Sequence, residues 1–170
     1  MRKALLLLLP GLLAGATVLE AAKVRTQHDP KADFSSFQTY RWQKAEGPGG
    51  PELDGPVRAA ANKELAERGL RLVAEGEKAD LLLAYNAGFA DVLVAGFSLT
   101  VDWWGQMVAV PGGDSNVSAG LLFLMTRPEG GEPVWAGALI VRGTTESALQ
   151  IMRDRAPKYA RKILSNYPPR

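Results

Sequence analysis

The alternation of apolar and polar positions predicts that strands form most of this chain. Residues 23–28 and 37–43 alternate between the two kinds of side chain, and 79–90 is an apolar run of strand length. A period of two indicates a strand with one buried face, and a short apolar run between turn residues indicates a buried strand. Residues 120–127 and 133–141 predict a hairpin, because "PEGGE" between them supplies a Gly-Gly turn. Shorter strands are predicted at 70–73 and 97–105, and "MVAVPGGDSNVS" (107–118) is predicted to be a connection.

One segment after the second strand has the apolar spacing of a helix. Val57, Ala61 and Leu65 recur every four residues, Pro56 suits the first turn, and Gly69 favours the end. The stretch before it, "AEGPGGPELDGP", holds enough Gly and Pro to predict a loop.

A second helix is predicted at the end of the chain. Thr144 or Thr145 supplies a capping hydroxyl, and Pro168 ends the helix. Pro157 is expected to bend or split it, because proline removes a backbone donor inside a helix. The predicted apolar stripe consists of Leu149, Met152, Ala156, Ala160, Ile163 and Tyr167.

These elements together predict an α+β fold. Two helices and about six strands, with sequential hairpins, favour a largely antiparallel sheet with both helices packed on one face. The length suits a single domain, which we place at residues 23–168.

The first residues of the chain have the layout of a secretory signal. Arg2 and Lys3 precede an apolar run from Ala4 to Val18, which is shorter than the ~20 residues that a membrane-spanning helix needs. Small residues before a cut after Ala16 predict a signal peptide at 1–16, with an end near residue 22 as the alternative. Ala16 also occupies the place where a lipoprotein signal has its lipid-accepting cysteine. We therefore expect an exported, periplasmic or envelope-associated protein without a lipid anchor.

Charge and cysteine content narrow the function classes. Loss of Arg2 and Lys3 with the signal leaves 18 basic and 18 acidic residues, so the total charge gives no support for nucleic-acid binding. The chain has no cysteine, which excludes a disulfide framework, a thiolate metal site and a cysteine nucleophile.

Four segments match a known family in order and spacing over nearly the whole chain after the signal. They are "DPKADFSSFQTYRWQ" from Asp29, "AANKELAERGLRLVAEGEKADLLLAY", "VWAGALI" and "ARKILSNYPP". In these segments the chain resembles the bacterial envelope family called domain of unknown function 4136. The resemblance implies an exported α+β domain, and it implies no catalytic residues because the family has no established activity. Its members often carry a lipoprotein signal, whereas this chain has Ala16 in place of the lipid-accepting cysteine of such a signal.

No segment carries a catalytic, metal or cofactor motif. His28, Asp29 and Asp33 could bind zinc only if all three converged, and Asx-type turns are the favoured interpretation of the two aspartates. The segment around Ser98 lacks the second glycine of a nucleophile elbow. We therefore assign no catalytic, metal-binding or cofactor-binding residue and expect no enzymatic activity.

The stretch "VDWWGQMVAV" is the candidate contact site. Trp103 and Trp104 would point to opposite faces of a strand, so one of them is expected outside the core, with Met107 nearby. Such a residue either contacts a protein, a glycan or lipid headgroups, or covers a sheet edge. Asp102 beside the two rings is the basis of the alternative function, an envelope glycan hydrolase.

The last helix carries a basic side. Arg155, Lys158 and Lys162 fall together at helical spacing and could contact anionic lipid, although a solvated helix face is the favoured interpretation. The sequence thus predicts a non-catalytic exported module that binds a partner or helps to assemble or maintain the envelope.

Overall fold

The computed structural model describes residues 23–43, 50–90, 97–101, 107–111, 117–143 and 145–169. The signal segment and Ala16 lie outside these residues. The helical elements are η1 (Phe34–Ser36), α1 (Gly50–Glu67) and α2 (Thr145–Leu164). The strands are β1 (Val24–His28), β2 (Thr39–Trp42), β3 (Arg71–Leu72), β4 (Leu81–Ala90), β5 (Phe97–Val101), β6 (Met107–Pro111), β7 (Val117–Thr126) and β8 (Pro133–Gly143).

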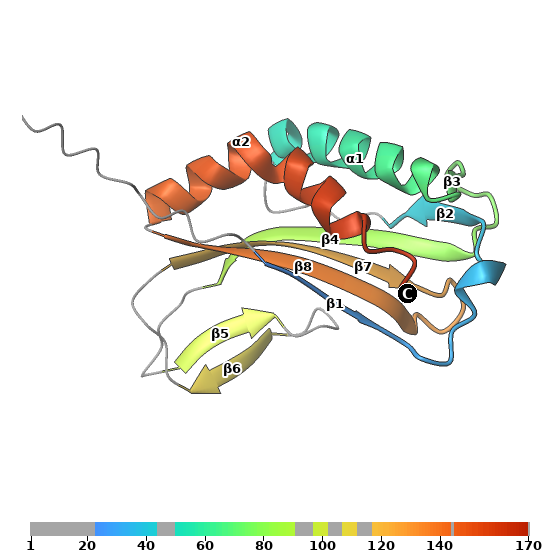
Figure 1. Ribbon diagram of the computed structural model, residues 1–170, viewed down its shortest axis with the longest axis horizontal. Coiled ribbons are helices and arrows are strands. Elements are labelled where there is room, and N and C mark those ends of the chain that lie inside the picture. Colours follow the sequence, from blue (N-terminus) through green and yellow to red (C-terminus); the bar gives the residue numbers. More distant parts are fainter. Residues whose placement is uncertain are drawn as a thin grey trace, which may run out of the picture.

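Six of the strands form one mixed sheet, in the order β1-β8-β7-β4-β2-β3 (Figure 1). The pairings β1–β8, β8–β7 and β7–β4 are antiparallel, as predicted. However, β2 runs parallel to both β4 and β3, so the expectation of a largely antiparallel sheet is only partly right. The reason is the crossover through α1, because a chain that returns over the sheet through a helix brings its next strand back in parallel.

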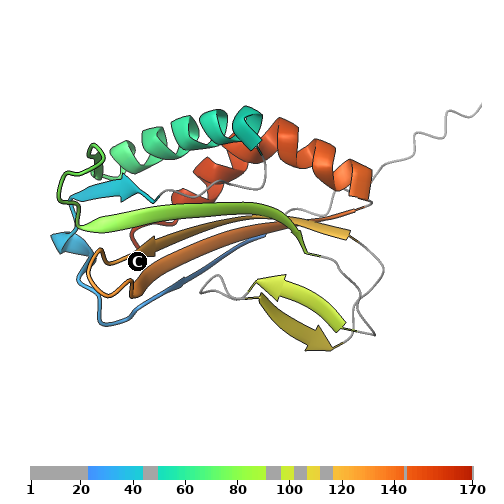
Figure 2. The ribbon, with the colours of Figure 1, turned by 180° about the vertical axis from the view of Figure 1, so that it is seen from behind.

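Both helices lie on one face of this sheet, which confirms the α+β class (Figures 1 and 2). The core between the layers contains three buried alternating residues of β7, Leu121, Phe123 and Met125. Val57 and Leu65 of α1 belong to the same core cluster, and α2 packs over β7 and β8. Neither described helix has the length and apolar character that a bilayer crossing requires.

The first helix begins at Gly50 rather than at Pro56, so part of the predicted loop is helical. Leu53 belongs to the core, and Asp54 accepts a hydrogen bond from the Tyr85 hydroxyl at 2.6 Å. These long-range contacts stabilise the extra turns although Pro56 removes a backbone donor within the helix.

The second helix continues through Pro157 without a split. The described members of its predicted stripe (Met152, Ala156, Ala160, Ile163 and Tyr167) are buried, as expected.

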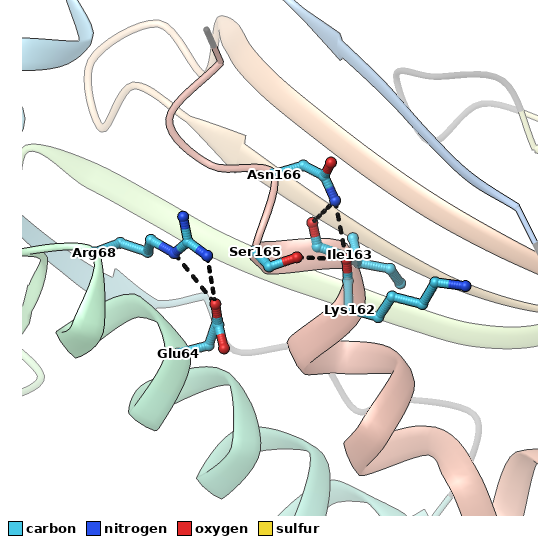
Figure 3. A network of polar contacts seen from close by, with 6 residues as sticks. All are labelled: Glu64, Arg68, Lys162, Ile163, Ser165 and Asn166. Atoms are coloured by element: carbon cyan, nitrogen blue, oxygen red, sulfur yellow. Dashed lines mark hydrogen bonds and ion pairs between the residues drawn. The ribbon is translucent and has the colours of Figure 1, made fainter.

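The end of α2 lies beside the end of α1 in Figure 3. The Asn166 amide donates to the Lys162 and Ile163 carbonyls, and the Ser165 hydroxyl donates to the Lys162 carbonyl. These bonds satisfy carbonyls that the end of a helix leaves without partners. On α1, Glu64 and Arg68, which are one turn apart, form an ion pair with 3.0 Å between the guanidinium nitrogen and the carboxylate oxygen.

A glycine leaves room for the largest buried side chain, the Trp135 indole. The Trp135 indole lies so close to Gly137 that a Cβ atom at position 137 would collide with it and with Ile163. The Tyr167 ring then packs edge-to-face on Trp135, with the ring centroids 5.8 Å apart. Gly137 is therefore required by the packing between β8 and α2.

Two strands form a separate pair, β5–β6, on the side of the sheet away from the helices (Figures 1 and 2). The prediction of a connection at 107–118 is wrong at both ends, because residues 107–111 pair with residues 97–101 and residues 117–118 begin β7. The predicted strand at 97–105 ends at Val101, and residues 102–106 lie outside the described residues.

Candidate functional site

The sheet has a second face, which the helices do not cover. Along β7 the residues that alternate with the core positions, Leu122 and Leu124, are half-buried and point to this side. The register places Leu122 between Asn86 and Ala138, and it places Leu124 between Ala84 and Ala136. We call the apolar residues on this side the outer face; they are Leu82, Ala84, Leu122, Leu124, Ala136, Ala138 and Ile140.

Ile140 is the most exposed part of the outer face. Its side chain is 44% exposed, and the other large exposed apolar residue in the described part of the chain is Leu72 of the edge strand β3, at 42%. Arg25 and Gln27 of β1 flank the apolar residues along the neighbouring strand. An apolar centre with polar residues at its margin is the usual arrangement of a protein contact surface.

One end of the outer face leads to a cavity of about 540 Å³. It lies where β4 begins and β7 ends, and its walls come from η1 and β2, from the loop before β4, and from the β7–β8 turn. The residues that line it are Ser36, Phe37, Arg41, Glu77, Lys78, Ala79, Asp80, Arg127, Pro128 and Glu129.

The acid at the back of this cavity is held by the backbone of β2. Asp80 accepts hydrogen bonds from the Thr39 hydroxyl at 2.7 Å, the Thr39 N–H at 2.8 Å and the Gln38 N–H at 3.0 Å. These bonds, that of the Thr39 hydroxyl first, hold the pKa of Asp80 below its ordinary value. Asp80 is therefore a charged structural group that positions β2, rather than a proton donor near neutral pH.

Two polar atoms near the cavity are buried without a hydrogen-bond partner among the described residues. They are Nε of Arg41 and Oγ1 of Thr126, which lie in register on either side of Leu82. Arg127, on the turn after Thr126, lies over the Phe37 ring with its guanidinium carbon 5.5 Å from the ring centroid. The cavity thus combines guanidinium groups with an aromatic wall.

A separate polar network joins α1 to the sheet on the helix side. The amide oxygen of Asn62 accepts hydrogen bonds from the Tyr40 hydroxyl at 2.8 Å and from the Trp42 indole N–H at 2.9 Å. Burial raises the pKa of Tyr40, so its hydroxyl remains a donor. The network therefore orients two aromatic rings beneath the helix.

The adjoining acid in this region is Asp54. Burial tends to raise its pKa, but hydrogen bonds from Arg58 and Tyr85 outweigh burial and lower the pKa. The Arg58 guanidinium also lies over the Trp42 ring, 4.5 Å from its centroid. Because Asp54 stays ionised against these partners, this arrangement anchors α1 and does not supply a general acid.

His28, Asp29 and Asp33, which could bind zinc only by converging, form no such group. His28 is exposed and packs edge-to-face on Phe34, while Asp29 accepts from the Lys31 N–H and Asp33 from the Ser35 N–H. The Asx-type interpretation of both aspartates is confirmed. Across the described ranges, no group of three or more His, Asp or Glu residues is placed to hold a metal ion.

The candidate contact residues fall mainly outside the described part of the chain. Asp102, Trp103 and Trp104 belong to 102–106, and Met107 is the first residue of β6, paired with Val101. The strands that flank this segment lie on the same side of the sheet as the outer face (Figures 1 and 2). Arg155, Lys158 and Lys162 are exposed on α2.

Sequence reasoning missed the cavity. One available signal was Arg41, a charged residue between Tyr40 and Trp42 in an otherwise aromatic strand. Its role as a cavity residue cannot be predicted from the sequence, because the cavity forms only when three separate segments fold together.

Comparisons with known proteins place the fold. No curated protein matches the chain significantly. A crystal structure of a PDZ domain protein from Parabacteroides distasonis is similar, with a TM-score of 0.63 and 14% identity, over 88% of this chain and 36% of that one. The chain thus spans about a third of that protein's length.

A DUF4136 family protein from Bacteroides thetaiotaomicron has a TM-score of 0.52 and 20% identity, with 86% of this chain and 96% of that chain covered. The family described as "Domain of unknown function (DUF4136)" matches residues 24–169, which include every described strand and both helices. This chain therefore belongs to the DUF4136 family.

Proposed function

We propose that this chain is an exported, non-catalytic module of the bacterial envelope that binds a partner protein through its outer face. The observation that carries the proposal is the exposure of Ile140, which lies on the outer face beside Gly120, toward the Gly143 end of β8. Exposed apolar area is costly in water, and burial against a partner recovers about 25 cal/mol per Å².

The position of β5–β6 supports a contact surface on this side of the sheet. The strands β5 and β6, which flank Trp103 and Trp104 in the sequence, lie on the outer-face side of the sheet, and our proposal adds these two tryptophans to Ile140 as contacts of one partner. Tryptophan is enriched among the residues that contribute most to protein interfaces. A glycan or a lipid surface is the competing class of ligand.

Export is part of the same proposal. The charged start, the short apolar run and the small residues before Ala16 support cleavage by a signal peptidase. With alanine in place of the lipid-accepting cysteine, the released domain would move freely in the periplasm. The basic side of α2, with Arg155, Lys158 and Lys162, would then allow at most a peripheral contact with anionic lipid.

A pair of matched variants tests the binding surface. Ile140→Lys places a charge on the outer face, whereas Leu72→Lys changes an equally exposed leucine on the far edge of the sheet. After crosslinking in cells and affinity purification, we expect one envelope protein to be depleted with Ile140→Lys and retained with Leu72→Lys. Retention of that protein by both variants, or its loss from both, would refute the outer face as the contact.

The non-catalytic part of the proposal has its own test. The purified chain should release no sugar from envelope glycan, and Asp102→Asn should change nothing. Glycan turnover that disappears in a folded Asp102→Asn protein would establish the hydrolase alternative instead.

A further inference from the structure

The cavity at the end of the sheet contains an arginine, Arg41, that forms no ion pair with any described residue. Nε of Arg41 is buried without a hydrogen bond, and none of the ion pairs between described residues includes Arg41. A charge that is partly removed from water is costly unless an opposite charge or a set of hydrogen bonds compensates for it. Within the part of the chain that the structure describes, the guanidinium of Arg41 therefore has no anionic partner.

The acids that line the cavity do not fill this role. The Asp80 carboxylate accepts three hydrogen bonds from Gln38 and Thr39, which hold it against β2. Glu77 and Glu129 are exposed, so water solvates their charges at the rim.

Two more cations line the same cavity from other segments. Lys78 is exposed in the loop before β4, and Arg127 comes from the turn after β7. Among the described residues Arg127 pairs with Glu132, whose carboxylate oxygen lies 4.0 Å from the Arg127 Nε and whose side chain is 76% exposed. Arg127 is thus only weakly paired and free to turn toward a ligand.

We propose that this cavity binds the oxyanion of a small ligand, a carboxylate or a phosphate, with Arg41 as its main contact and Arg127 as the second. Guanidinium groups bind both kinds of oxyanion through paired N–H donors. The Phe37 ring forms the apolar wall for the remainder of the ligand. The volume of about 540 Å³ lies within the range typical of small-molecule sites.

This inference goes beyond the proposed function and does not depend on it. Ile140 lies near the far end of β8 from the turn that lines the cavity. A failure of anion binding would leave the outer-face proposal unchanged, and the reverse also holds.

Titration of the purified full-length exported chain tests the proposal. Inorganic phosphate and succinate are added separately in Tris-chloride buffer, and binding is followed by calorimetry and by the NMR signals of the arginine Nε–H groups. We expect saturable binding of at least one probe with a shift of the Arg41 signal, and the tighter probe identifies the class of oxyanion. Absence of saturable binding for both probes would overturn the proposal.

Three variants separate a ligand site from general charge attraction. We expect Arg41→Gln to weaken binding about tenfold or more, as loss of a charged hydrogen bond does, and Arg127→Gln to weaken it less. Arg153→Gln removes an equal charge from the exposed side of α2 and should leave binding unchanged. Equal binding by Arg41→Gln, or an equal loss with Arg153→Gln, would contradict the proposal.

Thermal unfolding distinguishes a ligand contact from a structural arginine. Because Arg41 forms no ion pair with a described residue, Arg41→Gln should keep or raise the Tm in chloride buffer. It should also lose the rise in Tm that the bound probe gives the natural chain. A large fall in Tm without any probe would assign Arg41 a structural role and overturn the proposal.

Discussion

Thr39 and Asp80, which are 41 residues apart in the chain, hydrogen-bond to each other in both directions. The Thr39 hydroxyl donates to the Asp80 carboxylate at 2.7 Å, and it accepts from the Asp80 N–H at 3.0 Å. The contact ties the start of β2 to the residue before β4, where these two strands begin their parallel pairing. It therefore helps to fix the register of the parallel β2–β4 pairing, which begins beside the cavity.

Replacement of the Asp80 carboxylate should destabilise this end of the sheet. We expect Asp80→Asn to lower the free energy of unfolding at pH 7 by about 1–3 kcal/mol, because charged acceptors hold their hydrogen bonds more strongly than neutral ones. Urea unfolding of both proteins measures the difference. Thr39→Val, which deletes only the hydroxyl, should give a smaller loss in the same assay.

The effect of Asp80 should also depend on pH. Since the folded pKa lies below the ordinary value of 3.8, the stabilisation is present above that value and is lost as the pH falls through the folded pKa. The difference between the natural chain and Asp80→Asn should accordingly shrink below about pH 4. A difference that stays constant down to pH 2 would show that the ionised carboxylate is not its source.

Gly137 should be intolerant of any side chain. Gly137→Ala brings a methyl group into the Trp135 ring and to 2.6 Å from Cγ2 of Ile163, so we expect a loss of about 1–3 kcal/mol from overpacking. Gly120→Ala is the matched control, because its nearest contact is an ordinary 3.7 Å to the Leu139 carbonyl. Equal stability of the two variants in thermal unfolding would contradict the packing described for Trp135.

Asn62 should couple two aromatic donors to α1. Asn62→Ala leaves the Tyr40 hydroxyl and the Trp42 indole N–H without their acceptor, and we expect a loss of about 1–3 kcal/mol. A double-mutant cycle with Tyr40→Phe measures the coupling. The second change should cost less in the Asn62→Ala background than alone, and strictly additive losses would argue against the bond.

Local patterns predicted most of the elements correctly. The Gly-Gly turn of the β7–β8 hairpin has positive φ at Gly130 (81°) and Gly131 (66°), a conformation that glycine adopts without strain. The alternation around Tyr40 and Trp42 places both on the helix side, as their shared bond to Asn62 shows. Such features depend on residues that are close together in the sequence, so the sequence alone predicts them.

Long-range contacts account for what was not predicted. The start of α1 depends on Leu53 in the core and on Asp54 meeting Tyr85, which is 31 residues away. The parallel β2–β4 pairing follows from the return of the chain over the sheet through α1, a long-range path that no local pattern indicates. The cavity is lined by Arg41, Asp80 and Arg127, which are far apart in the sequence. No local sequence pattern predicts that they lie close together.

A single substitution tests the export proposal. We expect the natural chain to remain unlabelled by palmitate in cells and to fractionate with the periplasm. Ala16→Cys restores the lipid acceptor after Leu13-Ala14-Gly15 and should be labelled and move to the membrane fraction. Labelling of the natural chain would overturn the proposal that it is released.

The central claim is that the outer face binds a partner, and site-specific photocrosslinking in living cells tests it most directly. A photoreactive residue replaces Ile140 in one experiment and Leu72, of matched exposure, in the other. The account predicts a discrete adduct with an envelope protein from position 140 and none from position 72. The absence of an adduct at 140, or the same adduct at both positions, would contradict it.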